Sequence, residues 1–102
     1  MKGKIDKQKV YDYLASIPKG KVVTYGQIAR FLGNVHYARV VGNILHENPD
    51  GKKYPCYKVV NAQGKLSEQY AFGGLEAQKQ RLEEDGVVVR DGKVDLGVYQ
   101  WE

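Results

Sequence analysis

The chain has 102 residues, of which 42% are hydrophobic and 27% are charged, a composition typical of one small globular domain over residues 1–102. No apolar run approaches the length of a membrane span, and no apolar stretch follows the lysines at the start, which argues against a signal peptide. A single cysteine excludes an internal disulfide, and with two histidines it makes no recognisable zinc pattern. We therefore expect a cytoplasmic protein that needs no metal and no cofactor.

The charge is distributed unevenly along the chain. Residues 1–65 hold twelve Lys/Arg and four Asp/Glu, a net charge of +8, whereas residues 66–102 hold four and eight, a net charge of −4. A basic front segment favours contact with a polyanion, although a solvated lysine-rich surface gives the same count. Eight tyrosines are compatible with nucleic-acid contact but do not require it.

The first predicted helix covers residues 6–17. Apolar residues recur at helical spacing on one of its faces: Val10, Leu14 and Ile17. Asp6 can cap the start of the helix, and the Pro-Lys-Gly sequence at 18–20 should end it. A short extended segment is expected over residues 21–23.

A helix-turn-helix is predicted next. Thr24 and Gln27 have the spacing of a capping box, so a helix should begin after Thr24 and end at Gly33. A second helix, capped by Asn34, is expected over about residues 36–47. Its apolar stripe should be buried: Val40, Val41, Ile44 and Leu45. The spacing is a moderate signal, because other small helical hairpins share it.

Short strands are predicted after the helix-turn-helix. Residues 54–60 should form a buried strand, residues 61–64 a turn, and residues 65–66 the start of a return strand. This hairpin would be a wing beside the two helices. The predicted fold is therefore α+β, a small winged helix-turn-helix domain with a C-terminal helix and hairpin.

That C-terminal part has clear local signals. A helix is expected over residues 74–85, with Gly86 at its end. The sequence VVVRDGKVDL predicts a hairpin, because Asp-Gly at 91–92 is a favoured tight-turn pair. Tyr99 and Trp101 are expected to dock the C-terminus onto the body of the protein.

Five stretches of the chain form a combined pattern: IPKGKVVTYGQIA (17–29), ARVVGN (38–43), NP (48–49), PCYKVV (55–60) and GGLEAQKQRLEEDGV (73–87). Their order and spacing resemble the DNA-binding domain of the O6-alkylguanine-DNA alkyltransferases. The tail GKVDLGVYQW is similar to that of the shorter alkyltransferase-like proteins. The resemblance covers about residues 10–101, and its combined specificity is high.

The resemblance implies a mechanism and a partner, double-stranded DNA containing O6-alkylguanine. Such proteins bind the minor groove with the second helix of the helix-turn-helix and flip the damaged guanine into a pocket. The enzymes transfer the alkyl group, once per molecule, to a cysteine in a Pro-Cys-His-Arg-Val motif. The alkyltransferase-like proteins carry another residue there, bind the lesion and hand it to nucleotide excision repair.

The resemblance also assigns residues to DNA contact. Arg39 matches the arginine that fills the space left by the flipped base, and a planar, permanently charged guanidinium suits this role. Tyr25 matches the tyrosine that crowds the 3′ phosphate, and Gly42 matches a small residue that lets the helix approach the groove. Ala38 and Lys58 are expected to contact DNA as well. The alternatives are an ordinary phosphate contact for Arg39 and a core tyrosine at position 25.

Three aromatic residues depart from the family pattern. Tyr37 stands where the enzymes carry a small residue, so it would contact the sugar-phosphate backbone or alter the approach to DNA. Tyr70 and Phe72 belong to the loop that closes the pocket in the family. Each is expected either to stack on a flipped base or to pack in the core.

The cysteine motif is incomplete. Cys56 matches the alkyl acceptor, and Asn48 matches an asparagine that braces the motif. Tyr57 replaces the histidine that takes the proton of the thiol, and the glutamate that holds this histidine falls on Asp85. A free thiol has a pKa of about 8.5, and burial raises it, so little thiolate forms at neutral pH without a general base.

We therefore expect a monomeric DNA-repair protein that recognises O6-alkylguanine by base flipping, while Cys56 transfers the alkyl group slowly or not at all. The first alternative is an active single-turnover methylated-DNA–protein-cysteine methyltransferase that uses Cys56. The second is a winged-helix transcription regulator that reads a specific sequence in the major groove. A DNA-independent interaction domain is a further alternative, and it predicts no salt-dependent DNA binding.

Overall fold

The computed structural model describes residues 6–68 and 70–102. Residues 1–5, which include two of the counted lysines, and residue 69 lie outside the described part. Helix α1 (Lys7–Ser16) begins at Asp6, whose side chain accepts a hydrogen bond from the Gln8 N–H at 2.9 Å. Val10 and Leu14 are fully buried on its inner face. The predicted cap and apolar face of the first helix are confirmed.

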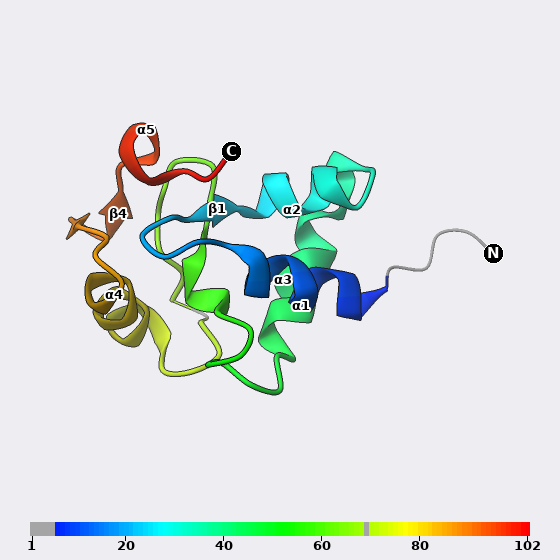
Figure 1. The fold of residues 1–102 in the computed structure, drawn as a ribbon, viewed down its shortest axis with the longest axis horizontal. Helices are drawn as coiled ribbons and strands as arrows, with labels where there is room; N and C mark the ends of the chain where they lie inside the picture. The colour runs from blue at the N-terminus through cyan, green and yellow to red at the C-terminus, as the bar shows by residue number, and fades with distance from the viewer. Residues whose placement is uncertain (1–5, 69) are drawn as a thin grey trace.

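The helix-turn-helix is also present. Helix α2 (Tyr25–Phe31) begins with the predicted capping box, in which Thr24 and Gln27 exchange side-chain to backbone hydrogen bonds of 3.1 and 2.9 Å. The second helix begins as the 3-10 turn η1 (Val35–Tyr37), which Asn34 caps, and continues as α3 (Ala38–His46). Helix α1 packs against α3 (Figure 1), which helps to hold α3 in place.

The prediction of a buried apolar stripe on α3 is wrong at one position. Val41, Ile44 and Leu45 are buried, whereas Val40 is 40% exposed. An i, i+3, i+4 stripe begun at Val41 excludes its neighbour at 40, because successive helical residues point about 100° apart. Val40 therefore lies on the outer face of α3.

The strand pairing differs from the expected wing. Strand β1 (Val23–Thr24) pairs in parallel with β2 (Val59–Val60), so β2 does not form a hairpin with residues 65–66. Only Val59–Val60 of the expected strand over residues 54–60 is a strand, and Cys56–Lys58 form the 3-10 turn η2. Lys65 makes an isolated antiparallel bridge to Lys93, at the far end of the molecule.

The C-terminal part follows the prediction closely. Helix α4 (Gly74–Glu84) precedes a hairpin of β3 (Val89–Arg90) and β4 (Lys93–Val94). Its turn has φ of +53° at Asp91 and +71° at Gly92, which a type I′ turn requires. The short helix α5 (Leu96–Tyr99) was not predicted. Trp101 then packs on the core beside α1, and its N–H donates to the Val22 carbonyl at 2.8 Å.

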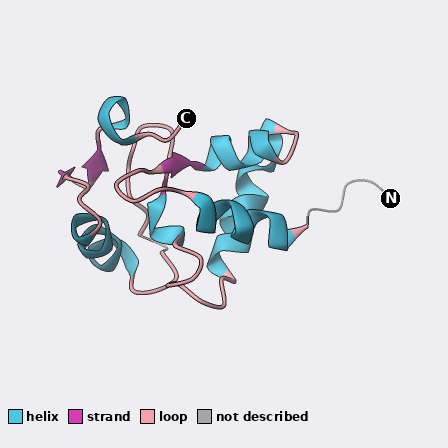
Figure 2. Ribbon diagram, viewed as in Figure 1, coloured by secondary structure: helices cyan, strands magenta, loops and turns pink. Residues whose placement is uncertain are grey.

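Two clusters of buried residues make up the core. One lies among α1, α2 and α3 and includes Cys56 and Tyr70, and the other joins α4 to the C-terminal hairpin. Figure 2 shows that helices dominate and that strands are confined to two short pairs, so the mixed helix and strand class is confirmed. Within the described ranges, no helix is long and apolar enough to cross a membrane.

Candidate functional site

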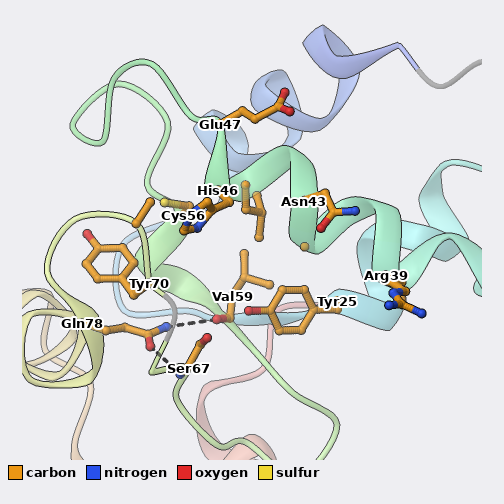
Figure 3. A pocket seen from close by; sticks show the side chains of 14 residues that line it. Tyr25, Arg39, Asn43, His46, Glu47, Cys56, Val59, Ser67, Tyr70 and Gln78 are labelled. Atoms are coloured by element: carbon orange, nitrogen blue, oxygen red, sulfur yellow. Dashed lines mark hydrogen bonds between the residues drawn. The ribbon is translucent and has the colours of Figure 1, made fainter.

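A cavity of about 860 Å³ lies between α3, the η2 turn and the loop before α4 (Figure 3). Six of the residues singled out from the sequence line it: Tyr25, Ala38, Arg39, Gly42, Cys56 and Tyr70. These residues come from four separate segments of the chain, and folding brings them to one place. In Figure 3, the Arg39 and Tyr70 side chains lie at opposite ends of the cavity.

Helix α3 supplies the open rim of the cavity. Arg39 is exposed at its first turn, and Gly42 follows almost one turn later. A Cβ at position 42 would meet only the Tyr25 ring, at 4.0 Å, so packing inside the protein does not demand glycine there. Glycine instead leaves this face of α3 flat beside an aromatic ring, as close approach of another molecule requires.

Tyr25 connects the helix-turn-helix to the loop before α4. It is the first residue of α2, and the preceding capping box fixes the direction of the backbone there. Burial raises the pKa of Tyr25, and a hydrogen bond with Ser67 opposes this shift. The phenol therefore remains protonated at neutral pH and lies between Gly42 of α3 and Ser67.

Cys56 lies in the wall of the cavity and is 5% exposed. Burial raises the pKa of its thiol, while a hydrogen bond with Asn48 and the positive charge of Arg81 oppose this shift. Asn48 is itself buried, and its Nδ2 donates to the Tyr54 carbonyl at 2.7 Å. Asn48 thus braces the loop that leads into the cysteine turn, and the thiol is held mainly in its neutral form.

Tyr57 does not line the cavity. Its ring packs against both core clusters, and the Arg81 guanidinium lies 5.5 Å from the ring centroid. Burial and the nearby negative charge of Asp85 raise the pKa of Tyr57. A phenol that keeps its proton cannot accept one from the Cys56 thiol.

The DNA contact expected for Lys58 is wrong. Its side chain is buried, and the Nζ atom lies 3.1 Å from Asp85 Oδ2 and donates to the Pro18 carbonyl at 2.8 Å. The same Asp85 oxygen accepts a hydrogen bond from the Gly20 N–H at 2.9 Å. Asp85 therefore holds Lys58 and the turn after α1, and not the side chain at position 57.

Phe72 and Tyr37 also lie outside the cavity wall. Phe72 packs on Gly51, where an added Cβ would be 3.0 Å from the ring, and it meets the Tyr70 ring edge-on with centroids 5.8 Å apart. Phe72 is 41% exposed, so it does not pack in the core, and its stacking on a flipped base stays a prediction. Tyr37 is half-buried in η1 and packs against the first core cluster.

Gln78 is a site residue that the sequence analysis missed. It is 1% exposed, and its Nε2 donates to the Tyr57 and Val59 carbonyls at 3.0 and 3.1 Å. Its Oε1 accepts from the Ser67 N–H at 2.8 Å, as the dashed lines in Figure 3 show. Helical spacing was an available signal, because positions 75 and 82 lie three before and four after Gln78 on the same inner face.

The described residues offer no group of three His, Cys, Asp or Glu side chains that could hold a metal ion. The cavity thus offers one buried thiol, phenols that keep their protons, the exposed Arg39 and the side chains of Asn43, His46 and Glu47. Such a cavity suits recognition of a planar group that enters beside α3. His46 and Glu47 also line the cavity, so an imidazole and a carboxylate belong to the same wall as the thiol (Figure 3).

Comparison with known proteins is consistent with this geometry. The family model described as 6-O-methylguanine DNA methyltransferase, DNA binding domain, matches residues 6–87. A DNA base-flipping protein of Vibrio parahaemolyticus is 43% identical over 95 residues, which cover 92% of this chain and 93% of that protein. Alkyltransferase-like protein 1 of Schizosaccharomyces pombe is 41% identical over 100 residues, which cover 92% of each chain.

A solved structure is similar over almost the whole chain. It is the crystal structure of S. pombe Atl1 in complex with damaged DNA containing O6-carboxymethylguanine. The two chains superpose with a TM-score of 0.84 at 39% sequence identity, and 94% of each is covered.

The buried ion pair gives a stability prediction. Asp85→Asn leaves the Lys58 ammonium buried without its counter-charge, so we expect the free energy of unfolding to fall by about 3 kcal/mol. Urea denaturation measures this change. The control is Lys7→Met, which breaks the exposed Lys7–Glu47 pair and should change stability little. Equal effects of the two substitutions would contradict a structural role for the buried pair.

The burial of Cys56 gives a prediction about pH. Because burial raises the pKa of the thiol, a higher pH than usual is needed to form the reactive thiolate. The rate of alkylation by iodoacetamide, followed by mass spectrometry, should still rise steeply at pH values where a free cysteine, with a pKa of about 8.5, approaches its plateau. A plateau below pH 8 would mean that an unrecognised group activates the thiol.

Proposed function

Because the chain belongs to the family of the 6-O-methylguanine DNA methyltransferase DNA-binding domain, we propose that it binds O6-alkylguanine in double-stranded DNA through the minor groove. The damaged base rotates out of the stack and enters the cavity beside α3. Alkyl transfer to Cys56 is slow or absent. The observation that carries the proposal is one cavity that has the exposed Arg39 at its rim and Cys56 in its wall.

The rim supports DNA binding with base flipping. Arg39 projects from the first turn of α3, where a planar guanidinium can stack in the space that a flipped base leaves. The flat face at Gly42 allows α3 to approach a groove closely, and Tyr25 stands beside it. The Vibrio relative is a DNA base-flipping protein, and the similar Atl1 structure contains damaged DNA.

The residues around Cys56 support slow alkyl transfer. Proton transfer by a placed general base contributes typically 10²–10⁴-fold to a rate. Tyr57 keeps its proton and packs away from the cavity, and the Asp85 carboxylate is already held by Lys58 and Gly20. Tyr57 and Asp85 therefore do not supply the base and the carboxylate that the family pattern places beside the cysteine.

Active transfer is the second candidate, and one observation favours it: the thiol does line the cavity. A thiolate placed there would attack the alkyl carbon, the carbon–O6 bond would break, and the released guanine would take up a proton. A sufficiently reactive methyl group would need only a correctly placed thiolate.

A protein that binds without repairing must pass the lesion on. We propose that it acts as a cytoplasmic monomer and recruits nucleotide excision repair proteins. Analytical ultracentrifugation tests the oligomeric state. The free protein should sediment as a monomer, and its DNA complex should contain one copy per lesion.

The decisive experiment combines transfer and binding on one sample. The protein is incubated with a duplex that contains one O6-methylguanine and is then analysed by intact-protein mass spectrometry and by gel shift, with Cys56→Ser as the control. We expect selective binding of the lesion and no mass increase. A methyl increment that the control lacks would establish the transferase, and absence of both signals would refute the proposal.

Arg39 is tested by substitution with alanine. We expect Arg39→Ala to reduce the preference for the lesion over undamaged DNA by about tenfold, the loss of roughly one stacking contact. The matched control is Arg90→Ala, which removes an exposed arginine from the C-terminal hairpin, away from the cavity wall. An equal loss of affinity for damaged and undamaged duplex would make Arg39 an ordinary phosphate contact.

A further inference from the structure

The outer face of the C-terminal hairpin carries a row of three positive charges. Arg90 of β3 stands directly opposite Lys93 of β4, and Lys93 in turn pairs with Lys65 through the isolated antiparallel bridge. Residues directly opposite each other on an antiparallel ladder share a face, where like charges repel. All three side chains are exposed, and none forms an ion pair with a residue that the structure describes.

The core fixes the direction of these cations. Their neighbours along the chain are buried in the second core cluster: Leu66, Val89 and Val94. Because successive side chains of a strand point to opposite faces, burial of these three residues places positions 65, 90 and 93 on the outer face. The repulsion within the row is therefore imposed by the fold, and the row is presented to the outside at fixed spacing.

A hollow of about 320 Å³ lies beside two of the cations. Its lining combines charge with apolar surface: Val88, Arg90, Lys93, Asp95, Val98 and Tyr99. Val88 and Val98 are 51% and 58% exposed, and they are the large exposed hydrophobic residues of the described chain after α4. Asp95 is the cap of α5, where its carboxylate accepts a hydrogen bond from the Gly97 N–H at 2.9 Å.

The hollow is separate from the cavity that contains Cys56. The two share no lining residue. Along the longest axis of the molecule in Figure 1, β4 and α5 lie at the opposite end from α2. A molecule bound in the hollow would therefore leave the rim at Arg39 free for DNA.

The composition of the hollow indicates which kind of molecule fits it. Exposed cations attract carboxylates or phosphates, whereas two exposed valines gain from burial under an aliphatic group. A DNA backbone would supply the phosphates but would leave Val88 and Val98 in water. A peptide with both acidic and aliphatic residues satisfies the charges and the valines together.

We propose that the hairpin surface, formed by Val88, Arg90, Lys93 and Val98, is a docking site for an acidic segment of a partner protein. An aliphatic side chain of that segment enters the hollow beside the two valines, and its carboxylates lie on Arg90 and Lys93. The identification of the partner as a repair protein recruited to the lesion rests on the proposed function, whereas the surface itself does not.

A synthetic peptide in which leucine alternates with glutamate is the probe. It is titrated into the full chain, and binding is followed by amide NMR spectra. We expect saturable shift changes at residues 88–99, and we expect the double variant Arg90→Glu, Lys93→Glu to bind about tenfold more weakly, because its charges repel the peptide. Val98→Ser should weaken binding by about fivefold through the lost apolar contact.

Matched controls separate docking from a general attraction of anions. The variant Lys9→Glu, Lys52→Glu changes the net charge by the same amount at two exposed lysines outside the hollow, and it should bind the peptide as wild type does. A peptide with glycine in place of leucine should bind more weakly than the probe. Equal losses in the two double variants, or shifts that are not localised to the hairpin surface, would overturn the inference.

A duplex containing O6-methylguanine tests whether the surface is a DNA contact instead. We expect the variant Arg90→Glu, Lys93→Glu to bind this duplex with unchanged affinity, and a saturating amount of duplex should leave the peptide bound. Displacement of the peptide by the duplex, or loss of duplex affinity in the variant, would overturn the inference in favour of DNA. If wild type binds the peptide but does not select the lesion, the proposed function fails and the docking surface stands.

Discussion

The buried pair between Lys58 and Asp85 holds together the segments that shape the cavity. Lys58 belongs to the cysteine turn, Asp85 caps the end of α4, and both contact the 18–20 turn after α1. A buried ion pair is weak evidence for stability by itself, because desolvation offsets much of the attraction. Its value here is positional, since each charge is satisfied only when all three segments meet.

The same pair limits the chemistry of the site. A carboxylate that already accepts from Lys58 and from the Gly20 N–H has little capacity left to orient a proton acceptor at position 57. The Tyr57 ring, under Arg81, occupies the space between the core clusters. Restoring a histidine at position 57 would therefore supply an imidazole without its usual orienting partner, and the geometry of the turn favours binding over transfer.

Features that depend on local backbone chemistry could be predicted from the sequence. The Thr24–Gln27 capping box and the Asp91–Gly92 turn need only neighbouring residues, and both are present. The direction of the Lys58 side chain depends on partners 27 and about 40 positions away, so the expected DNA contact did not foresee its buried environment. That Arg39 and Cys56 share a cavity followed from the family resemblance, because no periodicity relates α3 to the cysteine turn.

The cavity wall contains buried polar groups whose desolvation is not offset by internal partners. The thiol of Cys56 is buried where its charged form is disfavoured, and the Tyr70 hydroxyl is buried without a partner among the residues that the structure describes. Gln78, by contrast, satisfies its amide completely, so the fold is able to pair buried polar groups a few residues away. A binding site differs from a core in this respect: groups that a ligand will satisfy remain unpaired in the free protein. The free energy recovered on binding then depends on the chemistry of the ligand.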